Sequence, residues 1–250
     1  MILSSTVYST LLSIIRKDGR GKSLSVDEYN LIAPIISQQI FDDMYRKFEE
    51  SIENSDDLGQ FKVFNRSIPL TATIGNTASI GTLPSDYEHI IGRPKTISGS
   101  TIRWLDVVST KEHAWRADDY LTQATTINPT CIIGGEDTSG NMYIRVNPYT
   151  ITTIYLDYLR TPDTPFLDYY VNDTTLRYTY ISANINQTIP SGSTYRTDLA
   201  GVIIVASQTV NWEYDMSDLD LIISKFLNYL GIQLRDEVLL QTGILNEQKS

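Results

Sequence analysis

Few side chains in this 250-residue sequence are suited to moving protons near neutral pH. There are two histidines, His89 and His113, and one cysteine, Cys131. With the Asp118-Asp119 pair they could supply the nucleophile, base and orienting group of a hydrolase. Nothing in their spacing requires that arrangement, and the nucleophile turn typical of hydrolases is absent from the sequence. We therefore expect a protein that is not an enzyme, with no catalytic residues, and keep a histidine-dependent hydrolase as a rival hypothesis.

Two short motifs resemble ligand-binding loops. Gly21-Lys22-Ser23 matches the end of a phosphate-binding loop, but Arg16 stands where the full pattern has glycine, and the preceding segment is predicted to be helical. Asp137 to Asn141 alternates oxygen-bearing side chains as a calcium loop does, without the later bidentate glutamate. Plain turns are the favoured interpretation of both motifs. A lone cysteine also excludes a multi-cysteine zinc site and an internal disulfide, so we expect no metal and no cofactor.

Aromatic residues are the more informative group, with 16 tyrosines in the chain. Cross-strand pairing of aromatic rings accounts for many of them without any function. Tyrosine and tryptophan also offer large, rigid area with a polar tip, which favours them at protein contacts. Both interpretations stay open. The candidate protein-interface residues are Trp104, Trp115, Tyr169, Tyr170, Tyr178 and Tyr180.

Helices are predicted at both ends of the chain. The strongest pattern runs from Ser25 to Glu50, with apolar residues at four-residue spacing and a capping box formed by Ser25 and Glu28. Pro34 lies inside this pattern and predicts a kink. A shorter helix precedes it, and another follows Asp215 or Ser217 near the other end. Asp236 to Leu240, with Leu245, is a further candidate helix. These helices are amphipathic, so each should pack against a partner.

The period of the apolar residues changes to two between about Phe61 and Trp212. Alternation is clearest in Met142 to Asn147 and Ile154 to Leu159, which we interpret as half-buried antiparallel strands. One helical turn is predicted at Thr110 to Tyr120. Other predicted strands are Phe61 to Phe64, Tyr87 to Ile91, Ile102 to Val108, Leu176 to Ile181 and Gly201 to Val210. Short strands at this spacing favour a sandwich.

The predicted fold is α+β, with N- and C-terminal helices packed together and an inserted antiparallel β-sandwich. Residues 1–58 and 211–250 form the predicted helical domain, and residues 59–210 the β-sandwich domain. A 41% hydrophobic composition is ample for such cores. The formal charge of −10 argues against tight binding to a nucleic-acid backbone. The first 15 residues lack the features of a signal peptide or membrane span, so we expect a cytosolic protein with no membrane partner.

Several stretches, in the same order, resemble the ring proteins of the head-to-tail connector of tailed bacteriophages, in particular those of crAss-like phages. Together they span nearly the whole chain. They are Asp27 to Leu31, Gln39 to Asp42, Phe48 to Glu50, Leu83 to His89, Asn147-Pro148, Ile154 to Tyr158, Leu159 to Pro162, Trp212 to Tyr214 and Asn228 to Ile232. The chain departs from the pattern in its tyrosine-rich stretch and in Asn184 to Thr197, which are long.

The resemblance implies a virion structural protein without catalytic residues. Such portal adaptors assemble as twelve-subunit rings, or dodecamers, below the portal protein, extend the DNA ejection channel and dock neighbouring ring or tail proteins. DNA is then only passing cargo in the lumen, where acidic side chains would repel it. The implied location is the virion connector or tail, with assembly in the host bacterial cytoplasm. The alternative is a carbohydrate-binding β-sandwich protein of the tail, with Trp104, Trp115 and the tyrosine-rich hairpin stacking on sugar faces.

Overall fold

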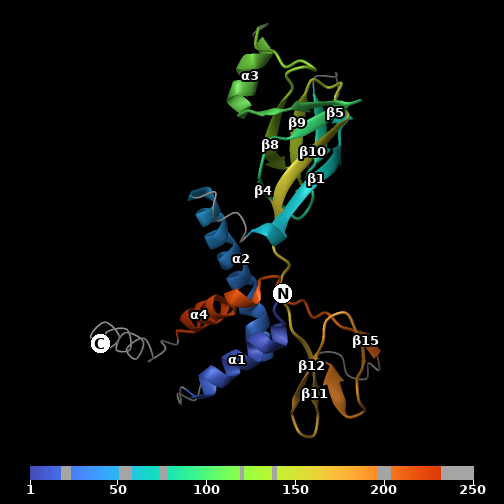
Figure 1. Ribbon diagram of the computed structural model, residues 1–250. Coiled ribbons are helices and arrows are strands. Elements are labelled where there is room, and N and C mark those ends of the chain that lie inside the picture. Colours follow the sequence, from blue (N-terminus) through green and yellow to red (C-terminus); the bar gives the residue numbers. More distant parts are fainter. Residues whose placement is uncertain are drawn as a thin grey trace, which may run out of the picture. The chain divides into compact units, whose positions relative to one another are not determined.

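The computed structural model describes residues 1–17, 24–50, 58–73, 78–118, 121–136, 140–195 and 204–231. The fold is mixed α+β, as predicted, with helices toward both ends and strands between them (Figure 1). The chain divides into two compact units. Unit 1 comprises Met1–Glu49 and Pro162–Ser250, and unit 2 comprises Glu50–Thr161. Unit 1 thus includes residues 162–210, which the sequence analysis assigned to the β-sandwich domain.

Three helices of unit 1 follow the predicted pattern. They are α1 (Ser4–Lys17), α2 (Val26–Glu50) and α4 (Leu219–Tyr229), the last preceded by a 3-10 turn at Met216–Asp218. The capping box of α2 is formed, because the Ser25 amide donates to Glu28 Oε2 at 2.9 Å and the Glu28 amide donates to Ser25 Oγ at 3.1 Å. Helix α2 runs through Pro34 without a break. A second capping box at Asp215 and Asp218 starts the 3-10 turn.

A buried aromatic cluster joins the two ends of the chain in unit 1. We define this terminal cluster as Tyr8 of α1, Tyr29 of α2, Trp212 and Phe226 of α4, all 4% exposed or less. The rings of Tyr29 and Phe226 stack at 5.4 Å, and Trp212 meets Phe226 edge to face at 5.9 Å. Trp212 Nε1 donates to Tyr29 Oη at 2.8 Å, so its polar group is satisfied inside the core. The predicted packing of N- and C-terminal segments is therefore present.

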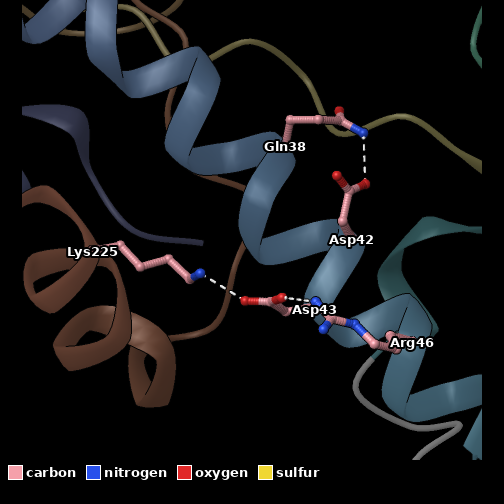
Figure 2. Close-up of polar contacts among 5 residues, drawn as sticks. All are labelled: Gln38, Asp42, Asp43, Arg46 and Lys225. Carbon is pink, nitrogen blue, oxygen red and sulfur yellow. Dashed lines mark hydrogen bonds and ion pairs between the residues drawn. The ribbon is translucent and has the colours of Figure 1, made fainter. Parts of the chain in front are cut away.

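Polar contacts reinforce this junction on both sides of the cluster. The backbones of Ile2 and Trp212 exchange two hydrogen bonds of 2.9 Å, and Tyr214 Oη donates to the carbonyl of Ser37 at 2.5 Å. On the solvent side, Lys225 of α4 contacts Asp43 of α2 at 2.6 Å, and Arg46 approaches the other oxygen of Asp43 (Figure 2). Helices α2 and α4 are thus connected by buried aromatic packing and by a partly exposed ion pair.

Two small sheets complete unit 1. One has the order β12 (Tyr178–Ile181), β11 (Asp168–Asn172), β14 (Ser193–Tyr195), and the other pairs β13 (Asn186–Thr188) with β15 (Ile204–Ala206). The carboxylate of Asp168 is fully buried and accepts bonds from Tyr195 Oη at 2.8 Å and from the Gln208 amide at 3.0 Å. Because a buried charge is tolerated only when it is hydrogen-bonded, Asp168 fixes the segment around Gln208 beside β14.

The described residues of unit 2 form two sheets and the helix α3 (Thr110–Asp118). The first sheet has the order β1 (Lys62–Pro69), β10 (Thr153–Arg160), β5 (Lys95–Ser98), β6 (Thr101–Trp104), and β4 (Tyr87–Ile90) also pairs with β10. The second has the order β2 (Thr71–Ala72), β3 (Ser79–Thr82), β9 (Met142–Asn147), β8 (Thr130–Glu136), β7 (Asp106–Val107). All pairings are antiparallel except that of β7 with β8. The turn Gly59–Phe61 precedes β1.

The two sheets share one hydrophobic core. Ile144 and Val146 of β9 and Ile154 and Leu156 of β10 are fully buried and belong to the same cluster. The alternation predicted for β9 and β10 is therefore present, except that Leu159 of β10, expected on the opposite face, is also fully buried. Met142 departs from it, because its side chain at the start of β9 is 41% exposed. Two facing sheets over one aliphatic core make unit 2 a sandwich.

Several predictions fall outside the described residues. They concern Gly21 to Ser23, Asp137 to Ser139, and the helix proposed at Asp236 to Leu240 with Leu245. The predicted helical turn at Thr110 to Tyr120 is present as α3 (Thr110–Asp118) in its described part, and Asp119 and Tyr120 lie outside the described residues. Within the described ranges, none of the helices has the length and apolar character needed to cross a membrane.

Candidate functional site

The tyrosines proposed as interface residues lie in the β11–β12 hairpin of unit 1. Tyr169 is only 2% exposed, and its hydroxyl donates to Asp27 of α2 at 2.9 Å. Tyr180 is half-buried, with its ring 5.5 Å from that of Tyr8. These two side chains therefore hold the hairpin to the helices of the same unit. Tyr170 is half-buried and packs against the small core formed by Ile181, Ile189 and Tyr195. Tyr178 is 46% exposed and available at the surface.

The β5–β6 hairpin of unit 2 presents an apolar face to solvent. Lys95 pairs with Trp104 and Ile97 with Ile102, so these side chains lie on one side of the hairpin. Ile97, Ile102 and Trp104 are 44%, 54% and 53% exposed. The ammonium of Lys95 lies 5.5 Å from the centre of the Trp104 ring and covers part of it. Strand β6 is also the last strand in its sheet order. We call this surface the hairpin face.

Trp115 lies on α3 and is 69% exposed. Its ring has Lys111 as a cationic neighbour at 5.1 Å, and α3 is fastened to β7 by contacts of 3.7 Å between Arg116 and Asp106. Trp115 is thus a second exposed aromatic anchor in unit 2, on an element of its own. The two tryptophans proposed from the sequence are both accessible, whereas the tyrosines are mostly engaged within unit 1.

Three of the groups considered for a hydrolytic site lie on three different elements of unit 2, and Asp119 lies outside the described residues. His89 lies on β4, opposite Leu159 of the first sheet. His113 lies on α3 and contacts Asn147 of the second sheet through Nε2 at 2.6 Å. Cys131 is fully buried in the sandwich core, and burial together with the nearby Asp106 carboxylate raises the pKa of its thiol to about 12. Because the thiolate is the nucleophile, burial and the raised pKa both disfavour reaction at Cys131 in the folded chain.

His113 has a cationic neighbour, Arg145 of β9. Burial lowers the pKa of the His113 imidazole, and the charge of Arg145 lowers it further, although the hydrogen bond with Asn147 acts in the opposite direction. Both effects favour the neutral form of the imidazole, which contacts Asn147 and so joins α3 to β9. Arg145 Nε is buried and makes no hydrogen bond in the described part of the chain. No group of three or more potential metal ligands occurs among the described residues.

Unit 2 also contains a polar cavity of about 370 Å³, which the sequence did not predict. It is lined by Arg103 of β6 and by hydroxyl-bearing residues, including Thr150 and Thr152 just before β10. The threonine-rich stretch Thr150-Ile151-Thr152-Thr153 is visible in the sequence. What could not be seen is that Arg103, distant along the chain, lies beside that stretch, because strand pairing alone brings the two together.

The unit 2 surface therefore offers exposed aromatic side chains and a polar cavity. In unit 1 the terminal cluster and most of the tyrosines proposed as interface residues are buried or half-buried, and several of these side chains pack segments from the two ends of the chain together. No protein-family model matches this chain, and no curated protein matches it either.

Proposed function

We propose that this chain is a structural protein of a tailed-phage virion that forms a ring of the head-to-tail connector. In this proposal the ring extends the DNA channel below the portal protein and docks tail components, and its subunits assemble in the host cytoplasm. The proposal is motivated by the sequence stretches that resemble those of connector ring proteins and occur in the same order. The hairpin face is the structural observation that carries it, since a binding protein needs exposed anchors and this face supplies three apolar side chains together.

A closed ring requires one surface of a subunit to meet a different surface of the next. The hairpin face and α3 lie in unit 2, and the helical surfaces lie in unit 1, so the subunit has chemically distinct surfaces. We assign the hairpin face to the contact with the next copy in the ring. Trp104 with its covering Lys95 has the composition of an interface anchor, because aromatic side chains are enriched at the centres of interfaces.

The charge of the chain fits DNA as passing cargo. With a formal charge of −10, the protein lacks the cationic excess that holds nucleic acid by displacing counterions. A ring with carboxylates toward its lumen would repel the duplex and let it slide. Neutralising lumen-facing carboxylates should then slow DNA release. Unchanged release kinetics in such particles would count against this part of the proposal.

Mass measurement of the purified chain, alone and mixed with portal protein, tests assembly directly. We expect a dodecamer when portal is present, and either a monomer or a ring without it. The double variant I102S/W104S should lose the dodecamer, because it makes the hairpin face polar. The matched control is W115S, which removes an exposed tryptophan outside that face. The connector proposal would be overturned if the chain stayed monomeric in the presence of portal protein. It would also be overturned if complete virions assembled without this chain.

The second candidate is a carbohydrate-binding protein of the tail. The exposed rings of Trp104 and Trp115 favour it, because open aromatic faces can stack on sugars as well as on proteins. A glycan screen of the purified chain distinguishes the two. Specific glycan binding that is lost in W104S and W115S, without ring formation, would favour this candidate over the connector.

A further inference from the structure

The cavity of unit 2 lies where β5 and β10 meet. These strands pair at one register position, Lys95 with Tyr155, and the cavity is lined by the β5–β6 hairpin and by residues 150–153, which lead into β10. All of its lining residues belong to the described part of the chain. Its volume of about 370 Å³ lies at the small end of the range found for small-ligand pockets, roughly 300–1,000 Å³.

Arg103 gives this cavity a positive charge that the lining does not compensate. It is the one charged residue among the described residues that line the cavity. One guanidinium nitrogen donates to the carbonyl oxygen of Thr126, which holds the side chain in the wall. Arg103 forms no ion pair with a described carboxylate. A guanidinium has five N–H donors in a planar fork, so several remain for a two-point contact with an oxyanion.

Hydroxyl groups surround this charge. Thr96 Oγ1 donates to the carbonyl of Thr153 at 3.0 Å and so holds β5 to the segment before β10. Ser98, Thr150 and Thr152, each with a hydroxyl group, also line the cavity. Each can donate one hydrogen bond and accept others, which matches the alternating needs of a polyhydroxylated ligand. Tyr155 adds an aromatic ring with a polar tip.

We propose that this cavity binds an acidic sugar of about one hexose unit, with a carboxylate or phosphate on Arg103 and the ring hydroxyls on Ser98, Thr150 and Thr152. A neutral sugar leaves the guanidinium without a counter-charge, and a bare oxyanion leaves the hydroxyls unused. The shared chemistry is an oxyanion carried by a hydroxylated ring, which a sugar acid and a sugar phosphate both supply. This site shares Ile97 with the hairpin face but is centred on Arg103 and the residues before β10. It does not rest on the connector proposal.

Calorimetric titration of the full chain with four probes tests the site. The probes are glucuronate, glucose 6-phosphate, glucose and inorganic phosphate, at one ionic strength. We expect saturable binding of at least one acidic sugar, with glucose and phosphate about tenfold weaker or more, because each lacks one of the two sets of contacts. The preference between glucuronate and glucose 6-phosphate identifies the source of the oxyanion.

Three variants then locate the binding. R103Q should lower the affinity for the acidic sugar about 10- to 100-fold, because it removes the positive charge that contacts the oxyanion. T152V, which keeps the shape and removes an exposed hydroxyl, should weaken it about 2- to 10-fold. The control R93Q removes an arginine whose side chain is 71% exposed and which contacts Asp106 instead of the cavity, and it should bind like the wild type. Circular dichroism checks that each variant is folded.

Four outcomes would overturn the proposal. They are no saturable binding of either acidic sugar, equal affinity for glucose, equal affinity for inorganic phosphate, or unchanged binding by folded R103Q. Ring formation with portal is measured separately by mass. If the wild-type chain forms rings with portal but binds no acidic sugar, only the proposed sugar site is rejected. If it binds an acidic sugar but forms no rings, only the connector proposal is rejected.

Discussion

Unit 1 and unit 2 use aromatic residues in opposite ways. In unit 1, Tyr29, Trp212 and Phe226 are fully buried, and their rings and polar tips join segments from the two ends of the chain. In unit 2 the core is largely aliphatic, and Trp104 and Trp115 lie on the surface. Aromatic residues therefore stabilise the core of unit 1, whereas in unit 2 the two tryptophans are accessible at the surface.

This contrast has a physical reason. Segments far apart in sequence are held in one arrangement when buried aromatic rings carry hydrogen bonds, because a shifted arrangement would leave a buried donor unsatisfied. The sandwich of unit 2 gets its specificity from strand register, so its core needs only apolar volume. Trp104 and Trp115 lie outside this core, on the surface of unit 2.

The largest expected effect on stability comes from removing a ring of the terminal cluster. W212A should lower the free energy of unfolding of unit 1 by about 3–5 kcal/mol, because it empties a fully buried site. W104A, on the exposed hairpin face, should change it by less than about 0.5 kcal/mol. Urea unfolding followed by circular dichroism measures both. If W212A and W104A lowered the free energy of unfolding equally, the proposed difference between the aromatic residues of the two units would be wrong.

The core of unit 2 can be probed through its cysteine. L156A should destabilise the sandwich by about 2–5 kcal/mol and speed alkylation of Cys131, whose pKa of about 12 and burial protect it. I102A, on the exposed face, is the control and should leave the alkylation rate unchanged. W212A should also leave it unchanged if the units open separately. Faster alkylation in W212A would show that they open together.

The hydrogen bond inside the terminal cluster sets a smaller effect. Y29F keeps the ring but removes the acceptor of the Trp212 Nε1–H group, so we expect a loss of about 1–3 kcal/mol. Y149F removes a hydroxyl from a side chain that is 41% exposed and should cost almost nothing. Denaturant midpoints of the two variants provide the comparison. A Y29F protein as stable as wild type would mean that packing alone holds the cluster.

The smallest effect concerns the Asp43–Lys225 pair on the surface of unit 1 (Figure 2). The hydrogen bond and charge of Lys225 lower the pKa of Asp43, with Arg46 adding to the effect. A lowered pKa gives stability that is present above the unfolded-state pKa, about 3.9, and is lost as pH falls through the lower folded value. D43N should therefore cost about 0.5 kcal/mol near pH 7 and progressively less below about pH 4.

The matched control for this pair is D42N, since Asp42 accepts a hydrogen bond from Gln38 at 3.0 Å instead of contacting a cation. Thermal unfolding of both variants from pH 3 to pH 7 reads out the difference. If D42N shows the same pH dependence as D43N, the ion pair is not its source.

Local pattern alone predicted much of the fold. The helix from Ser25, with its capping box, and the alternation in Met142 to Asn147 depend only on neighbouring residues, so they could be recognised in the sequence. The packing of the terminal helices followed from their amphipathic faces, which need a partner. The grouping of residues 162–210 with those helices did not follow, because it depends on contacts such as Tyr169 with Asp27.

The sequence by itself therefore determined the main helices and the strands with clear alternation, such as β9 and β10. It also identified aromatic residues as candidate anchors. Strands without clear alternation, such as β8 and β11, were not predicted. Only the tertiary structure decided which aromatics remain exposed. Ile102 and Trp104 alternate like residues of a buried strand face, yet they point to solvent, because period two distinguishes two faces and does not say which is covered. The cavity of Arg103 and Thr152 likewise exists only through strand pairing, which joins residues that no local pattern relates.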